Sequence, residues 1–133
     1  MRITADRDYA AAAATIADEW LVAAPSAGFL GDVERLAGAA LVNQRFDVAV
    51  VPTLLGDLGR DFDDLYCAYV GKNVLNFFRQ DHGYRDGTYV KTWHGREDNE
   101  HLVEIVAALD PDEPAFRDRV YAALESRYGE VTN

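Results

Sequence analysis

The sequence has little of what stabilises secreted or membrane-spanning proteins. Its single cysteine, Cys67, has no partner for an internal disulfide and excludes a cysteine-rich zinc site. No apolar run approaches the roughly twenty residues that a membrane-spanning helix needs. The first ten residues, MRITADRDYA, are charged where a signal peptide requires an apolar stretch. We therefore expect a cytoplasmic protein that contacts no membrane.

Basic residues are also scarce. The chain carries 23 acidic and 13 basic residues, and its formal charge of −10 argues against nucleic-acid binding, which depends on many lysines and arginines. A small anion needs only a local positive cluster. Both lysines of the chain lie in one such segment, although chance is the competing explanation for so small a number. The cluster spans 25 residues and comprises Lys72, Arg79, Arg85, Lys91 and Arg96.

Helical periodicity of the apolar residues runs through the sequence, and an alternating strand pattern is almost missing. We predict an all-α fold, a helical bundle of about five to six helices in a single domain of residues 1–133. The hydrophobic content of 49% is enough for a modest core. Helices are expected at residues 8–22, 30–42, 48–58 with a kink or a short interruption near Pro52, 63–80, 97–108 and 115–128.

The same periodicity predicts which side chains are buried in the first two helices. For the last helix, Asp112 is the expected cap and Pro114 is expected near the first helical position. The predicted buried residues are Ile16, Trp20 and Leu21 in the first helix and Val33, Leu36, Ala37, Ala40 and Leu41 in the second.

Within the helix at 63–80, Lys72, Asn76 and Arg79 are spaced i, i+4, i+7 and share one face. Arginine binds phosphate oxygens in pairs, lysine acts as a compact charge, and asparagine donates to an oxygen or orients a metal-bound water. These three residue types suit a phosphate chain. From spacing alone, a solvated surface is the commoner explanation. The apolar residues expected around this face are Tyr66, Val70, Val74, Phe77 and Phe78.

The segment after this helix, HGYRDGTYVKTW, is predicted to be a turn followed by an extended stretch or loop. Gly83 and Gly87 let a backbone approach a ligand and leave amides free for an anion. Tyr84, Tyr89 and Trp93 have the bulk to close over a nucleotide. The competing interpretation is that each ring pins the loop to the core.

The run YVGKNVLNFFRQDHGYRDGTYVKTWHGREDNEHLVEIV, residues 69–106, resembles the C-terminal block of the dimeric dUTPases of the all-α NTP pyrophosphohydrolase superfamily. The resemblance implies a helical N-terminal part at 1–62, a phosphate-binding block at 63–109 and a C-terminal helix at 110–133. It assigns phosphate binding to Lys72, Asn76, Arg79, Tyr84 and Lys91. It further implies a nucleotide pocket that closes at Asn99, and the reasoning from the loop adds Gly83, Gly87 and Trp93 to that predicted pocket.

The chain departs from that family in its acidic residues. Family members carry two helical motifs, Glu-x-x-Glu and Glu-x-x-Asp, that hold magnesium in the N-terminal half. Here that half has only scattered acids such as Asp18 and Asp32. Glu97, Glu100 and Glu104 share a helix face but belong to the C-terminal block, where solvating the helix is the preferred explanation. We therefore expect no catalytic or metal-binding residue in this chain, and Mg²⁺ supplied by a partner.

These observations lead to three hypotheses. The first is a dUTP- or dUDP-binding subunit of a magnesium-dependent pyrophosphohydrolase that forms dUMP, acting in a homo- or hetero-oligomer with a carboxylate-bearing helical partner. The second is a non-catalytic nucleotide-binding or regulatory protein derived from a dUTPase. The third is a helical interaction module that binds no nucleotide.

Overall fold

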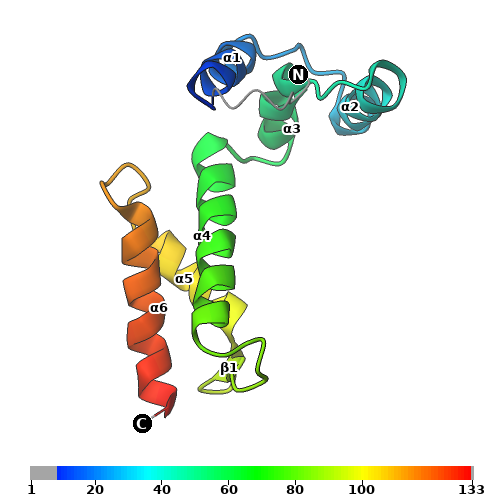
Figure 1. Ribbon diagram of the computed structural model, residues 1–133. Helices are drawn as coiled ribbons and strands as arrows, with labels where there is room; N and C mark the ends of the chain where they lie inside the picture. The colour runs from blue at the N-terminus through cyan, green and yellow to red at the C-terminus, as the bar shows by residue number, and fades with distance from the viewer. Residues whose placement is uncertain (1–8, 133) are drawn as a thin grey trace. The chain divides into compact units, whose positions relative to one another are not determined.

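The computed structural model describes residues 9–132, which are mostly helical (Figure 1). The all-α prediction is confirmed, because six α-helices hold most of these residues and their only sheet is a two-stranded hairpin. None of the described helices is long and apolar enough to cross a membrane. The elements are α1 (Tyr9–Leu21), α2 (Phe29–Asn43), the 3-10 helix η1 (Val48–Val50), α3 (Val51–Asp57), α4 (Phe62–Asp81), β1 (Thr92–Trp93), β2 (Arg96–Glu97), α5 (Asp98–Ala107) and α6 (Phe116–Thr132).

Four expected helices agree with α1, α2, α4 and α5 to within one residue at each end, although Asp8, the expected start of the first, lies outside the described residues. At residues 48–58 the interruption precedes Pro52. The chain forms the short 3-10 helix and then enters α3, where Pro52 occupies the first turn. Proline is tolerated there because the amide of that turn has no helical partner.

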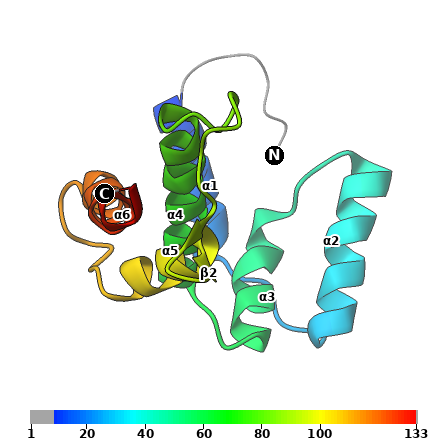
Figure 2. The same cartoon turned by 90° about the horizontal axis from the view of Figure 1, so that it is seen from below.

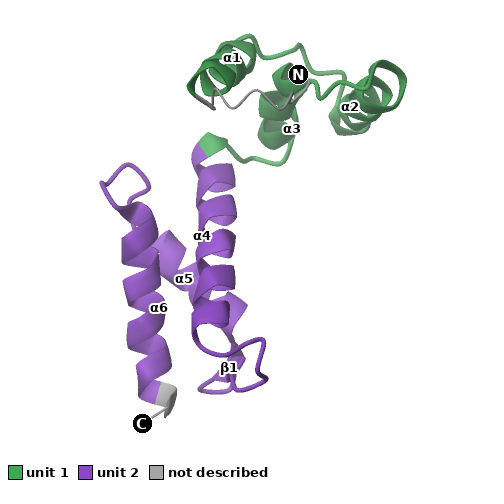
Figure 3. Ribbon diagram, viewed as in Figure 1, with its two compact units in different colours: residues 1–62 green, residues 63–133 purple. Residues whose placement is uncertain are grey.

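The chain divides into two compact units, residues 1–62 and 63–133 (Figure 3). We refer to them as unit 1 and unit 2. The boundary falls at the start of α4, where the sequence analysis also separates the N-terminal part from the phosphate-binding block. The description of the whole chain as one domain stays a prediction.

In unit 1 the 3-10 helix η1, with its buried Val48 and Val50, contacts α1, α2 and α3, and α2 lies beside α3 (Figure 2). Polar contacts add to this packing. Asp32 is fully buried and accepts hydrogen bonds from Ser26 Oγ at 2.9 Å and from the Ala27 amide at 3.2 Å. Thr53 Oγ1 of α3 donates to the Ala24 carbonyl at 2.7 Å. These bonds fix the segment that joins α1 to α2, because they satisfy polar groups that burial would otherwise leave unpaired.

The predicted burial of the first two helices is wrong for most of the residues named. Leu21 of α1 and Leu41 of α2 each expose 82% of their surface. Trp20 is half-buried and its ring meets Phe62 edge-on, with centroids 5.3 Å apart. Periodicity identified the apolar faces correctly, but the described part of unit 1 does not cover them. Ile16, Val33, Ala37 and Ala40 are likewise exposed, and Leu36 is half-buried.

Unit 2 is built on α4, which packs against α5 and α6 around an aromatic core. Gly71 allows α5 to approach, since a Cβ added there would lie 2.9 Å from Val106 Cγ2. Phe77, expected in the apolar set, is half exposed instead and lies under the Arg117 guanidinium at 5.2 Å. The core comprises Val74, Leu75, Phe78, Trp93, Leu102, Ile105, Phe116, Val120, Leu124 and Tyr128.

A tight hairpin precedes α5. Thr92 pairs with Glu97 and Trp93 pairs with Arg96, so the extended stretch expected in TYVKTW forms β1 and turns back as β2. His94 and Gly95, the two residues between the strands, both have positive φ, 51° and 81°. That conformation matches the right-handed twist of a two-residue hairpin. The hairpin brings Glu97 directly to the start of α5.

The predicted cap of the last helix is wrong. α6 begins at Phe116, and the residue before it, Ala115, accepts the first helical hydrogen bond from the Arg119 amide at 3.0 Å. Ala115 has a φ of 62°, so the helix cannot run back through it to Pro114. Asp112 and Pro114 therefore belong to the turn that precedes α6.

Candidate phosphate-binding site

The face of α4 that carries Lys72, Asn76 and Arg79 is not uniformly exposed. Lys72 and Asn76 are exposed, whereas Arg79 keeps only 14% of its side chain in contact with solvent. The helix buries the opposite side through Val74 and Phe78. The expected common face of the three polar residues is therefore present, with Arg79 at its more buried end.

Three consecutive residues at the start of α5 gather the cations that the sequence analysis singled out. Lys72 Nζ donates to Asn99 Oδ1 at 2.6 Å. Arg79 binds both carboxylate oxygens of Asp98, at 2.7 and 2.8 Å. We call the resulting group the α5 cluster; its members are Lys72, Arg79, Lys91, Glu97, Asp98 and Asn99, with Lys91 Nζ 3.3 Å from Glu97 Oε2.

Asp98 is the centre of this cluster and is fully buried. Besides Arg79 it accepts a hydrogen bond from the Tyr89 hydroxyl at 2.9 Å. Burial by itself would raise the pKa of the Asp98 carboxyl, but hydrogen bonds from Arg79 and Tyr89 outweigh it and lower the pKa. The hydrogen bond to Asp98 raises the pKa of Arg79 in turn, and burial followed by the same bond raises the pKa of Tyr89. The ionised Asp98–Arg79 pair and the protonated Tyr89 phenol thus form one hydrogen-bonded unit.

Sequence reasoning named Asn99 but missed Glu97 and Asp98 as partners of the cations. The available signal was the triplet Glu-Asp-Asn at the start of a helix, where acidic residues are favoured by the helix dipole. A capping box that links Glu97 with Glu100 fixes this helix start. The structure therefore brings together residues up to 27 positions apart in the sequence.

Lys72 has a neutral partner, whereas Arg79 and Lys91 are each paired with a carboxylate. Asn99 is neutral, and among the described residues no carboxylate oxygen lies within 4.0 Å of Lys72 Nζ, as an ion pair would require. An ammonium group has three donors, so two remain after the bond to Asn99. Lys72 therefore presents an exposed positive charge with free donors.

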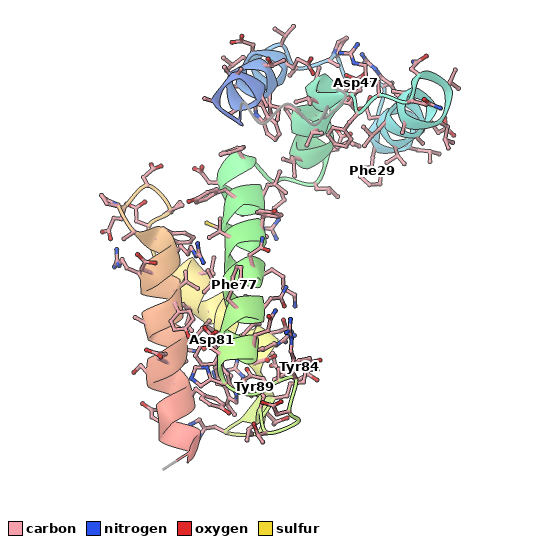
Figure 4. The ribbon with its side chains drawn as sticks, in the orientation of Figure 1. Phe29, Asp47, Phe77, Asp81, Tyr84 and Tyr89 are labelled. Atoms are coloured by element: carbon pink, nitrogen blue, oxygen red, sulfur yellow. The ribbon has the colours of Figure 1, made fainter. Side chains whose placement is uncertain are left out.

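The turn after α4 carries the predicted glycines and Tyr84 (Figure 4). Gly83 has a φ of 85°, and a Cβ there would overlap Thr88 Oγ1, so only glycine fits. Gly87 also has positive φ, 73°, with open space beside it. Tyr84 is exposed, and its ring centroid lies 6.1 Å from that of Tyr89. Of these residues, Gly83 serves the turn itself, and Tyr84 and Gly87 remain accessible to a ligand.

Trp93 lies in the core, so its predicted place in a nucleotide pocket is not supported. Its side chain is fully buried, and the indole Nε1–H donates to the Val90 carbonyl at 2.7 Å. The ring stacks on His101 at 5.2 Å and lies 5.9 Å from Phe78. Trp93 therefore follows the competing interpretation, in which an aromatic ring pins the loop to the core.

The acidic residues of α5 do not fit a magnesium site. Within residues 9–132 no group of three or more His, Cys, Asp or Glu side chains is arranged to hold a metal ion. Arg96 lies 3.4 Å from Glu100 and 2.7 Å from Glu104, and its hydrogen bond lowers the pKa of Glu104. Within the α5 cluster, Asp98 is buried and paired with Arg79, and Glu97 is exposed with its carboxylate 3.3 Å from Lys91 Nζ.

A scan against protein-family models finds no match to this chain, and a search of curated proteins finds none either. The resemblance to the dimeric dUTPases thus stays a prediction from the quoted residues.

Proposed function

We propose that unit 2 binds the phosphate chain of a nucleotide, with dUTP or dUDP as the ligand that the resemblance favours. The observation that carries this proposal is the α5 cluster, in which Lys72 presents an exposed charge that no carboxylate of the described residues neutralises. A chain with a formal charge of −10 repels anions in general, so a locally positive group is the natural place for one to bind.

Other exposed donors of unit 2 are the further candidates for this site. Asn76 lies one turn further along the same face of α4 and is exposed. Lys91 remains half exposed beside its partner, and a surface ion pair of this kind is weak enough to rearrange around a phosphate. Tyr84 offers an exposed phenol from the adjoining turn. With Lys72 and Arg79, these side chains make up the donor set that the resemblance assigns to phosphate.

For the reaction, we propose that this chain is one subunit of a magnesium-dependent dUTP pyrophosphohydrolase and that a helical partner supplies the carboxylates. Hydrolysis of a phosphoanhydride by this chemistry needs a metal to generate the nucleophile and neutralise charge. Here the nearby acids are engaged by Arg79, Lys91 and Arg96. This chain is therefore assigned binding, and no catalytic step is derived from its own residues.

The same engaged carboxylates favour a second candidate, a non-catalytic nucleotide-binding or regulatory protein. A phosphate-binding site without metal ligands is sufficient for a protein to bind a nucleotide and respond to it. The two candidates share the binding site and differ in what a carboxylate-bearing partner does to it. Release of dUMP on mixing with such a partner and Mg²⁺ supports the first candidate, and binding without turnover under any pairing supports the second. Brisk turnover by the chain alone contradicts the need for a partner.

Binding itself is tested by calorimetric titration of the full chain with dUTP, inorganic triphosphate and dUMP. Lys72→Met removes a charged hydrogen bond worth about 1.5–3 kcal/mol, so we expect affinity for dUTP and triphosphate to fall roughly ten- to a hundredfold. The matched control is Arg117→Met, an exposed cation on α6 outside the α5 cluster, which should leave affinity unchanged. Equal affinities for the wild-type chain and Lys72→Met would rule the site out.

A further inference from the structure

The Arg79 guanidinium is held along one edge only. Asp98 binds it through Nε, 2.7 Å from Oδ2, and Nη2, 2.8 Å from Oδ1. Nη1 makes no hydrogen bond to a described residue. Among those residues, the only fully buried side-chain nitrogen or oxygen without a partner is Glu19 Oε2. Nη1 is therefore not fully buried, so one edge of the guanidinium is held by Asp98 and the other edge has no hydrogen-bond partner among the described residues.

The carboxylate that fixes Arg79 is itself held rigidly. Asp98 is fully buried, its carboxylate also accepts a hydrogen bond from the Tyr89 hydroxyl at 2.9 Å, and its backbone amide donates to the Lys91 carbonyl at 3.0 Å. The bond to Arg79 reaches α4, and those to Tyr89 and Lys91 reach the loop. Asp98, at the start of α5, is thus bonded both to α4, which carries Lys72 and Arg79, and to the loop, which carries Lys91.

We infer that Asp98 is a positioning residue, which orients Arg79 so that its free edge binds the same phosphate chain as Lys72. This inference rests on the proposed function. An arginine that is already fixed loses little side-chain entropy when it binds, and its unused N–H groups keep the fork geometry that phosphate oxygens match. The buried acid therefore increases affinity for an anion, although its own charge is negative.

The direction of the change in triphosphate affinity in Asp98→Asn distinguishes the two possible roles of Asp98. If Asp98 acts only through its charge, Asp98→Asn removes a repulsion and raises affinity for inorganic triphosphate. If it positions Arg79, the same variant lowers affinity by about threefold to tenfold, the loss expected from freeing one side chain. Glu97→Gln is the matched control, because it removes an equal charge one residue away without touching Arg79. We expect its affinity to rise, because a negative charge is removed and Lys91 loses its carboxylate partner.

A double-mutant cycle separates positioning from damage to the fold. Arg79→Lys keeps a cation beside Asp98 but lacks the guanidinium N–H groups that face away from Asp98. In the Arg79→Lys background, Asp98→Asn should leave triphosphate affinity unchanged or raise it, because no guanidinium remains for Asp98 to orient. An equal loss on both backgrounds, or a gain on the wild-type background, would overturn the inference. Unfolding curves for all four chains establish that each is folded under the titration conditions.

If Asp98→Asn does not fold, Tyr89→Phe provides the same cycle with a smaller perturbation, since it removes only the hydroxyl bond to Asp98. Its loss of affinity should again depend on Arg79. The outcome also distinguishes this inference from the proposed function. A wild-type chain that binds no triphosphate overturns both, whereas wild-type binding with equal losses on the two backgrounds overturns only the role of Asp98.

Discussion

In unit 2, Phe78 of α4 is fully buried among the rings of Trp93, Tyr121 and Tyr128, whereas in unit 1 Leu41 of α2 lies on an equally apolar helix face and leaves 82% of its surface exposed. Both helices have the expected periodicity. The difference shows that periodicity identifies an apolar face without identifying what covers it. The free energy that each face contributes therefore has to be measured unit by unit.

The two tryptophans allow that measurement, because Trp20 lies in unit 1 and Trp93 in unit 2. In a Trp20→Phe background, fluorescence reports unit 2 alone. In a Trp93→Phe background it reports unit 1, with some destabilisation of unit 2 expected from the smaller ring. Urea unfolding followed in these two backgrounds gives each unit its own transition.

The largest difference in unfolding free energy is expected between variants of the apolar face of α4 and variants of the apolar face of α2. Phe78→Ala should lower the unfolding free energy of unit 2 by about 3–5 kcal/mol, because it leaves a cavity in the aromatic core. The matched change Leu41→Ala should alter unit 1 by less than about 0.5 kcal/mol. A comparable loss from Leu41→Ala would show that something covers the α2 face in solution.

A second contrast lies in the ion pairs. Arg79→Ala leaves the buried Asp98 without its cation and should destabilise unit 2 by about 3 kcal/mol. In unit 1, Arg35 and Asp47 are 3.6 Å apart and both partly exposed, so Arg35→Ala should cost only about 0–1 kcal/mol. Equal effects in urea unfolding would mean that the Arg79 pair is solvated.

Glycine-to-alanine changes should have opposite signs in the two units. Gly83→Ala places a Cβ in a left-handed turn against Thr88 and should cost unit 2 about 1–3 kcal/mol. Gly38 lies within α2 with open space around it, so Gly38→Ala should stabilise unit 1 by about 0.5–1 kcal/mol. Stabilisation by both variants would contradict the described conformation of the turn.

The smallest effect concerns acid pH. The pKa of Asp98 is lower in the folded chain than its ordinary value near 4, so its contribution to stability is present above pH of about 4 and is lost as the pH falls towards the folded-state pKa. One such group changes the unfolding free energy by at most about 1.4 kcal/mol per pH unit. Urea unfolding of unit 2 below this pH should show the loss, and Asp98→Asn should flatten it. An unchanged slope in that variant would assign the acid sensitivity elsewhere.

The sequence predicted the extents of four helices to within one residue because breaks and periodicity are local, but it placed the cap of the last helix wrongly. It also predicted that Lys72, Arg79 and Lys91 belong together, through their concentration in one segment and through the resemblance. It could not show that Asp98 holds Arg79, since that pair joins residues 19 positions apart across a tertiary contact. Nor could it distinguish Trp93 in the core from Tyr84 at the surface, because both are aromatic residues in the same loop.

The most direct test of the α5 cluster is a map of backbone amide chemical shifts in the isotopically labelled full chain during titration with inorganic triphosphate. We predict saturable shifts concentrated at Lys72, Asn76, the turn at residues 83–88, Lys91 and residues 97–99, with unit 1 unaffected. Shifts confined to unit 1, or none at saturating triphosphate, would contradict the assignment of a phosphate site to unit 2.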